Sequence, residues 1–82
     1  MSDHHILSRS TPVSCAVITV SDTRTPDTDT SGAMMQEMLR TIGCTVQYYT
    51  ILPDEPTQIR AQILTWLDIV DVILLNGGTG IS

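Results

Sequence analysis

Three short runs of apolar, mostly β-branched residues alternate along the chain with two stretches in which apolar residues recur every three or four positions. The runs lie at Val13–Val20, Thr45–Ile51 and Asp71–Leu75. Short runs without helical spacing are typical of strands, and the first indicates a strand of a parallel sheet that is buried on both faces. The second run has more polar residues, so we expect its strand to be less deeply buried.

Helical periodicity marks the two intervening stretches. The apolar residues on one face of the first helix are Met34, Met35, Met38, Leu39 and Ile42. Those of the second helix are Ile59, Ile63, Trp66, Leu67 and Val70. Gly43 stands where a left-handed C-terminal cap belongs, Asp54 is a candidate N-cap, and Pro56 suits a first helical turn. We expect Trp66 and the methionines to lie in the core.

The order strand, helix, strand, helix, strand predicts an α/β fold with a parallel sheet and right-handed crossovers. In such sheets, ligands bind beyond the carboxyl ends of the strands. The loops that gather there are Ser21–Ser31, Leu52–Pro56 and the segment from Asn76 onward. We expect residues 1–12 to be a disordered leader and residues 13–82 to form the folded part.

Composition narrows the classes of partner. The 82 residues are 41% hydrophobic and 16% charged, which suits one small core. A chain of this size buries only about 60 to 65% of its unfolded surface, so we expect association or a further segment to cover the remaining apolar faces. The net charge of −5 disfavours nucleic acid or an anionic membrane as a partner. No apolar run has the length of a signal peptide or a membrane span, which predicts a cytoplasmic protein.

Cysteine and lysine content exclude some kinds of site. Cys15 and Cys44 lie 29 positions apart, a spacing that fits neither a redox pair nor a zinc knuckle, so we expect buried, unpaired thiols. His4 and His5 belong to the polar leader, and we do not interpret them as metal ligands. The chain has no lysine, which excludes a Walker-type phosphate loop.

A glycine-rich segment, Gly77-Gly78-Thr79-Gly80, follows the third predicted strand. Backbone amides free of side chains can form a concavity for phosphate oxygens, and Thr79 adds a hydroxyl donor. A plain turn has the same composition. The dinucleotide fingerprint G-x-G-x-x-G is a poor match because it should follow the first strand, where an acidic, threonine-rich loop stands instead.

That acidic loop places Asp22, Arg24, Asp27 and Asp29 within eight residues. Carboxylates beside an anion site repel the ligand unless a cation lies between them, and Mg²⁺ usually has this role. The pattern therefore favours a metal–nucleotide site, with Asp22 and Arg24 at the strand end as its best candidates. In the alternative interpretation, Asp29 or Ser31 caps the first helix while Asp22 and Asp27 occupy turn positions.

Asp54 and the segment Asp27–Ser31 each allow two interpretations. Asp54 suits either a helix cap or a metal ligand. The segment Asp27–Ser31 matches the D-x-D-x-[TS] signature of haloacid-dehalogenase-type phosphatases, whose first aspartate is the nucleophile. We interpret this match as coincidence, because the signature should follow a strand directly and six residues, Ser21 to Pro26, intervene after Val20.

Four motifs occur in order along the chain: Val20-Ser21-Asp22-Thr23-Arg24, Asp29-Thr30-Ser31-Gly32, Pro53-Asp54 and Gly77-Gly78-Thr79-Gly80-Ile81. Together they resemble the MoaB/Mog family of molybdenum cofactor biosynthesis proteins across nearly all of Val13 to Ser82. The short spacing between Asp22 and Asp29 is more similar to the MoaB branch than to the Mog branch. The resemblance implies a three-layer α/β/α molybdopterin-binding domain, of which this chain supplies about β-α-β-α-β, the N-terminal half.

The resemblance also implies a function. Family members bind the phosphate of molybdopterin as trimers or hexamers, and active members transfer AMP to it from Mg-ATP. It implies Asp54 as catalytic residue and Mg²⁺ ligand, and a homotrimer or homohexamer with the pathway's molybdate-insertion protein as a further partner. The implied cofactor-binding residues are Ser21, Asp22, Arg24, Asp29, Ser31, Gly32, Gly77, Gly78, Thr79 and Gly80.

Two departures limit this expectation. The family's second acidic residue lies in an Arg-Asp pair past the glycine loop, which this sequence does not contain, and Asn76 replaces a hydroxyl residue. We therefore expect the 82-residue chain alone to be inactive, and a complete protein to be a molybdopterin adenylyltransferase. The alternatives are a non-catalytic molybdopterin-binding or scaffold protein and, in third place, a phosphotransfer domain that uses the aspartate cluster.

Overall fold

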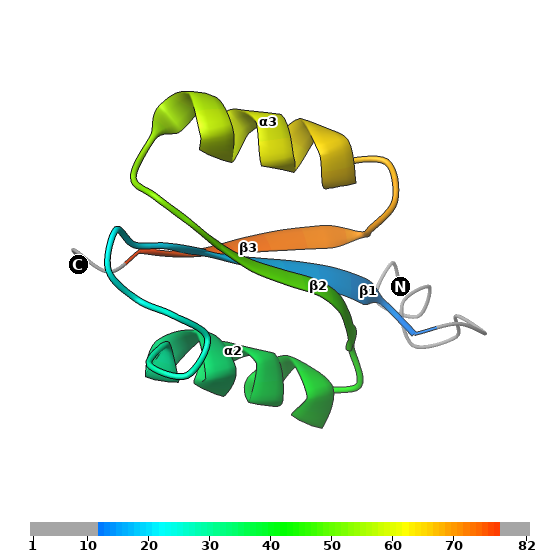
Figure 1. Cartoon of the computed structure of the whole chain (residues 1–82). Coiled ribbons are helices and arrows are strands. Elements are labelled where there is room, and N and C mark those ends of the chain that lie inside the picture. Colours follow the sequence, from blue (N-terminus) through cyan, green and yellow to red (C-terminus); the bar gives the residue numbers. More distant parts are fainter. Residues whose placement is uncertain (1–11, 78–82) are drawn as a thin grey trace.

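Three strands form one sheet, and one helix packs against each of its faces (Figure 1). In chain order the elements are β1 (Ser14–Val20), α2 (Thr30–Thr41), β2 (Thr45–Leu52), α3 (Pro56–Trp66) and β3 (Val72–Gly77). The computed structural model describes residues 12–77. Residues 1–11 of the expected leader and Gly78–Gly80 of the glycine loop lie outside the described residues. Within residues 12–77, no helix has the length and apolar character that crossing a membrane requires.

The sheet is parallel throughout, with the order β2-β1-β3. The central strand β1 is buried on both faces, and its residues from Cys15 to Thr19 are at most 1% exposed. β2 lies at the edge and is only partly buried. The predicted α/β fold, the parallel pairing and the ranking of burial between the first two strands are all confirmed.

Each face of the sheet has its own apolar cluster. On one face, Ala16 and Ile18 of β1 pack with Trp66 and Val70. On the other, Cys15 and Val17 pack with Leu39 of α2. The prediction that Trp66 belongs to the core is confirmed, and the ring of Tyr48 stacks on it with centroids 5.3 Å apart.

Neither cysteine forms a disulfide: Cys15 is buried, whereas Cys44 is half-buried. Burial, together with the neighbouring Cys44 thiol, raises the pKa of Cys15 to about 11. The expectation of unpaired thiols is confirmed, and Cys15 remains protonated near neutral pH.

The methionines of α2 correct the expectation that they lie in the core. Met34 and Met38 are 60% and 63% exposed, although Met35 packs against the buried cluster. The reason is geometric: α2 packs chiefly on β1 and β2, which leaves Met34 and Met38 exposed. The helix ends as predicted, with Gly43 in the left-handed conformation at φ 91°.

The sequence predicted Asp54 as the N-cap of α3, but the N-cap is Glu55. Glu55 is extended, and its carboxylate accepts a hydrogen bond from the N–H of Thr57. Pro56 lies in the first turn, as predicted. Because proline suits the first helical position and keeps the preceding residue extended, the residue directly before it becomes the cap.

A buried carboxylate connects the elements that carry the loops. Asp29 is the N-cap of α2, is 1% exposed, and accepts the N–H of Gly32 at 3.0 Å through Oδ1. Its Oδ2 accepts the hydroxyls of Thr19 in β1 at 2.6 Å and Tyr49 in β2 at 2.5 Å. Burial acts to raise the pKa of Asp29, but these hydrogen bonds and the Arg24 charge outweigh it and hold the pKa below its ordinary value.

Replacing Asp29 with Asn should reduce the free energy of unfolding by about 2 to 3 kcal/mol at pH 7, because hydrogen bonds to a buried charge are lost. The pKa of Asp29 in the folded protein lies below the ordinary pKa of an aspartate in the unfolded chain. The stabilisation is therefore present above that value and is lost as the pH falls through the folded-state pKa. Urea denaturation from pH 7 to pH 2 measures the difference in the free energy of unfolding between the unsubstituted protein and Asp29→Asn. Asp27→Asn, in an exposed turn, is the matched control, and a difference that stayed constant down to pH 2 would contradict the prediction.

Gly32 is the glycine with no room for a side chain. A Cβ there would lie 2.0 Å from Oδ2 of Asp29 and 2.8 Å from Oγ1 of Thr19, whereas a Cβ at Gly43 would meet nothing within 4 Å. Gly32→Ala should therefore destabilise the fold by more than Gly43→Ala, which costs only backbone strain of about 1 kcal/mol. Thermal denaturation of both variants measures the loss of stability in each. A larger loss in Gly43→Ala than in Gly32→Ala would contradict the close packing at Gly32.

Candidate functional site

A pocket of about 340 Å³ lies at the carboxyl end of the sheet. Its lining comes from the end of β1, the loop after it, the loop after β2 and the end of β3. The residues are Val20, Ser21, Asp22, Thr23, Arg24, Asp54 and Gly77. Parallel strands bring their carboxyl ends to one edge, so segments far apart in the sequence meet here.

The loop after β1 is folded back by its first residue. The N–H of Ser21 donates to the carbonyl of Leu52 at 2.8 Å, which fixes the loop to the end of β2. The Ser21 hydroxyl then accepts the N–H groups of Thr23 and Arg24 at 3.2 and 3.1 Å. Ser21 therefore sets the loop's shape through a local side-chain turn.

Among the described residues that line the pocket, Arg24 is the one cationic residue. Its Nη1 donates to the hydroxyl of Ser31 at 2.9 Å and to Oδ1 of Asp29 at 3.4 Å. The side chain is 32% exposed, while that of Asp29 is fully buried. A guanidinium has five N–H donors in a planar fork, so anchoring through Nη1 leaves donors for an anion in the pocket.

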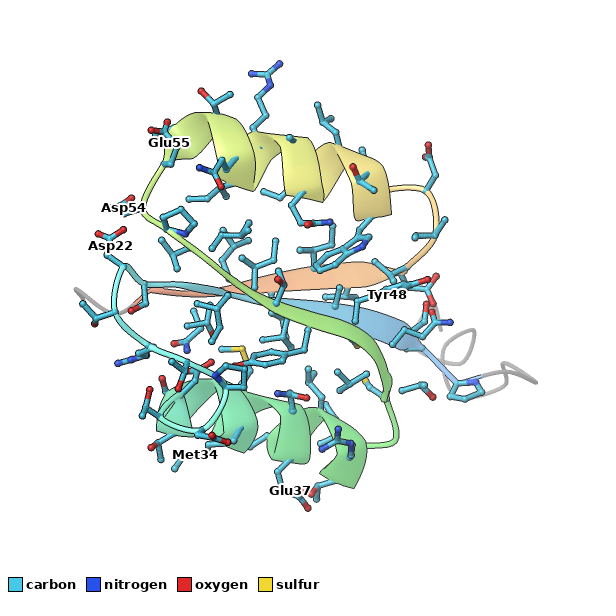
Figure 2. The ribbon with its side chains drawn as sticks, in the orientation of Figure 1. Asp22, Met34, Glu37, Tyr48, Asp54 and Glu55 are labelled. Atoms are coloured by element: carbon cyan, nitrogen blue, oxygen red, sulfur yellow. The ribbon has the colours of Figure 1, made fainter. Side chains whose placement is uncertain are left out.

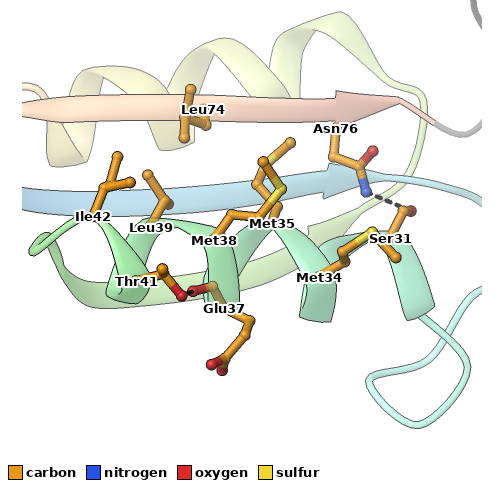
Figure 3. Close-up of a pocket in the computed structure, with 10 residues that line it drawn as sticks. All are labelled: Ser31, Met34, Met35, Glu37, Met38, Leu39, Thr41, Ile42, Leu74 and Asn76. Atoms are coloured by element: carbon orange, nitrogen blue, oxygen red, sulfur yellow. Dashed lines mark hydrogen bonds between the residues drawn. The ribbon is translucent and has the colours of Figure 1, made fainter.

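Asn76 ties the end of β3 to the same arrangement. Its Nδ2 donates to the hydroxyls of Ser31 at 2.9 Å and Thr19 at 3.3 Å, and the first of these bonds is visible in Figure 3. Sequence reasoning treated Asn76 only as a departure from a family pattern. A polar residue inside an apolar strand directly before the glycines was the signal that could have revealed it.

Two carboxylates stand together at the pocket. The N–H of Asp54 donates to Oδ1 of Asp22 at 3.1 Å, and Figure 2 shows both side chains at the same end of the sheet. Both residues are exposed, and their oxygens are the hard donors that Mg²⁺ prefers. Within residues 12–77, no group of three or more His, Cys, Asp and Glu residues could hold a metal by itself. A cation here would need oxygens from water or from a bound ligand.

The structure divides the predicted site residues into two groups. Those that line the pocket are Ser21, Asp22, Arg24, Asp54 and Gly77. Asp29, Ser31 and Gly32 are not in the lining but hold Arg24 and the start of α2. Val20 and Thr23 line the pocket without having been named as candidates, and Thr19 and Tyr49 were missed because their role depends on contacts between strands.

Asp27 and Asp29 are the two aspartates of the segment that matches the phosphatase signature. Its two oxygens accept four hydrogen bonds inside the protein, and the residue is buried. Asp27, the nucleophile position of that signature, is exposed in a turn that Thr25 and Thr28 close. The site is therefore built around the pocket and not around the D-x-D-x-[TS] segment.

The sequence of this chain is similar to sequences of known proteins. Residues 16–82 match the family MoCF_biosynth, described as a probable molybdopterin binding domain. The chain is 47% identical over 76 residues to molybdenum cofactor biosynthesis protein B of Halalkalibacterium halodurans, covering 85% of this chain and 42% of that protein. It is 40% identical over 85 residues to the protein of that name from Staphylococcus aureus, covering 100% of this chain and 51% of that protein.

A solved structure gives the same result for the fold. A crystal structure of a molybdenum cofactor biosynthesis protein B superimposes with a TM-score of 0.80 at 40% identity, covering 92% of this chain and 48% of that one. The chain spans about half the length of the curated relatives it matches. Since the family match includes most of the described sheet and the loops around its pocket, the chain belongs to the MoCF_biosynth family of probable molybdopterin binding domains.

Proposed function

We propose that this chain contributes one part of a molybdopterin site used in molybdenum cofactor biosynthesis, and that the pocket holds the phosphate of the pterin. The observation that carries the proposal is Arg24, which is anchored by Asp29 and Ser31 beside the pocket. A guanidinium already held in place loses little entropy when it binds an anion. Gly77, which leads into the glycine segment, lines the same pocket and supports this assignment.

We propose further that a complete protein adenylylates molybdopterin. In that reaction an oxygen of the pterin phosphate attacks the α-phosphorus of ATP, a new P–O bond forms, and pyrophosphate leaves. Both reactants are anions, so most of the rate must come from positioning them and compensating their charge. Asp54 and Asp22 would hold Mg²⁺, which would supply that compensation between phosphate oxygens.

The assembly of the complete protein is part of this proposal. We propose a cytoplasmic homotrimer or homohexamer that passes its product to a molybdate-insertion protein. Support comes from the family match and from large apolar side chains exposed on the described part of the chain, among them Leu64, Leu67 and Ile69. A non-catalytic molybdopterin-binding protein is the alternative, since membership of a family does not guarantee its chemistry.

Arg24→Gln should weaken the binding of inorganic pyrophosphate to this chain by at least about tenfold, because a charge-assisted pair with phosphate oxygens is lost. Isothermal titration calorimetry measures the affinity. Arg60→Gln is the matched control, since Arg60 is exposed on α3 and lies outside the pocket lining. Equal loss in the two variants would mean that removing a positive charge anywhere on this chain of net charge −5 lowers the affinity, and would contradict a specific contact with Arg24.

In a complete protein that carries this sequence as its first half, Asp54→Asn should lower adenylylation by at least about a hundredfold while molybdopterin binding changes little. Chromatography of the adenylylated product and a fluorescence titration with molybdopterin measure the two effects. Glu55→Gln is the control, because Glu55 caps α3 and does not line the pocket. Parallel loss of binding and turnover would assign Asp54 a structural role, and absence of turnover in the unsubstituted protein would favour the non-catalytic alternative.

A further inference from the structure

Asn76 is a polar residue at the end of an otherwise apolar strand. In the register of the parallel sheet it stands opposite Thr19 of β1, one position before Gly77 of the pocket lining. Its side chain is half-buried and lies beside Ser31 at the start of α2 (Figure 3). The nitrogen Nδ2 donates to Oγ of Ser31 at 2.9 Å and to Oγ1 of Thr19 at 3.3 Å. One amide group therefore joins β1, α2 and β3 next to the pocket.

The surrounding hydrogen bonds dictate which end of the Asn76 carboxamide faces these two hydroxyls. The ionised carboxylate of Asp29 can only accept, so the Thr19 hydroxyl gives its single hydrogen to Oδ2 of Asp29, at 2.6 Å. Toward Asn76, Thr19 can then only accept. A carboxamide oxygen in that place would meet a lone pair, whereas the NH₂ group has one hydrogen for each hydroxyl. Asn76 is therefore used as a double donor, which a carboxylate of the same shape cannot replace.

The same nitrogen determines how Ser31 meets Arg24. The Ser31 hydroxyl oxygen accepts Nη1 of Arg24 and Nδ2 of Asn76, each at 2.9 Å, which uses both of its lone pairs. A serine hydroxyl held by one partner alone can rotate between staggered positions, and the second partner prevents this rotation. The other contact of Nη1, with Oδ1 of Asp29, is longer at 3.4 Å. The closer of the two anchors of Arg24 is thus the one that Asn76 holds in place.

We propose that Asn76 is a positioning residue for phosphate binding: by donating to Ser31 and Thr19 it keeps Arg24 in the orientation that receives an anion in the pocket. The proposal rests on the assignment of the pocket to a phosphate, and it adds a residue that does not itself line the pocket. Without the Asn76 donors, Arg24 keeps only the anchor on the buried Asp29 carboxylate. The guanidinium then has more freedom to lose when an anion binds, and the affinity falls.

The first test is a double-mutant cycle on pyrophosphate affinity. Asn76→Leu keeps the branching of the side chain at Cγ but has no N–H group. It should weaken binding at least about threefold when Arg24 is present, and less than about 1.5-fold in an Arg24→Gln background. Isothermal titration calorimetry of the four proteins measures the cycle. Gln47→Leu is the matched control, because it removes an exposed amide from the edge strand β2, outside the pocket lining, and should leave the affinity unchanged.

A second readout needs no ligand. Nη1 of Arg24 has two acceptors, so rotation about its Cζ–Nη1 bond should be slow enough to give separate proton–nitrogen NMR signals for Nη1 in the unsubstituted chain. Asn76→Leu should merge these signals, and Gln47→Leu should leave them separate. A role in stability alone would not change the signals of protein that circular dichroism shows to be folded. Asn76→Val, a smaller side chain that suits a strand, takes the place of the leucine variant if that variant unfolds.

Either of two results would overturn the proposal. One is an equal loss of pyrophosphate affinity from Asn76→Leu with Arg24 present and in the Arg24→Gln background. The other is a set of Arg24 signals that Asn76→Leu leaves unchanged. Failure of the unsubstituted chain to bind pyrophosphate would instead contradict the phosphate pocket, and the NMR comparison would then decide whether Asn76 positions Arg24.

Discussion

One buried carboxylate determines how this chain holds the loops at the end of its sheet. Asp29 receives hydrogen bonds from β1, from β2, from the first turn of α2 and from Arg24. A charge with 1% exposure is tolerated in a small core only when its oxygens are fully paired, and here each oxygen accepts two donors. The same pairing that makes the charge tolerable also fixes the position of Arg24, so the stability of the fold and the geometry of the pocket depend on one group.

The connections around the hydroxyl of Ser31 extend this arrangement to the third strand. Ser31 accepts hydrogen bonds from Arg24 and from Asn76, and Asn76 also donates to Thr19. Ser31 at the start of α2 thus joins Arg24 of the pocket to the end of β3. The pocket lining comes from the strand ends and the loops after them, whereas Met34 and Met38 lie on α2, so the pocket forms while these methionines stay exposed.

Much of this could be predicted from the sequence, and the reasons are local. Periodicity located all five elements, Gly43 marked the end of α2, and the parallel sheet followed from alternation of strands and helices. The gathering of Ser21, Asp22, Arg24 and Asp54 followed from the rule that parallel strands align their carboxyl ends. These inferences need only the spacing of residues along the chain.

Other features depended on contacts that spacing does not encode. The family resemblance implied Asp29 as a cofactor-binding residue, and a helix cap was the alternative. The structure shows the cap, and burial against Tyr49, 20 positions away, keeps Asp29 out of the pocket lining. Met38 has the periodicity of a core residue, yet the described strands leave it exposed. The N-cap of α3 moved from Asp54 to Glu55 because of the proline that follows. That shift leaves the Asp54 side chain without a capping role and therefore strengthens its assignment to the pocket.

The most direct test of this account is a double-mutant cycle on pyrophosphate affinity that combines Asp29→Asn with Arg24→Gln, using protein that circular dichroism shows to be folded. If Asp29 acts by holding Arg24, Asn at position 29 weakens binding when Arg24 is present and has no further effect when Gln replaces it. An equal loss of affinity in both backgrounds would contradict the claim that the buried carboxylate positions the anion-binding group.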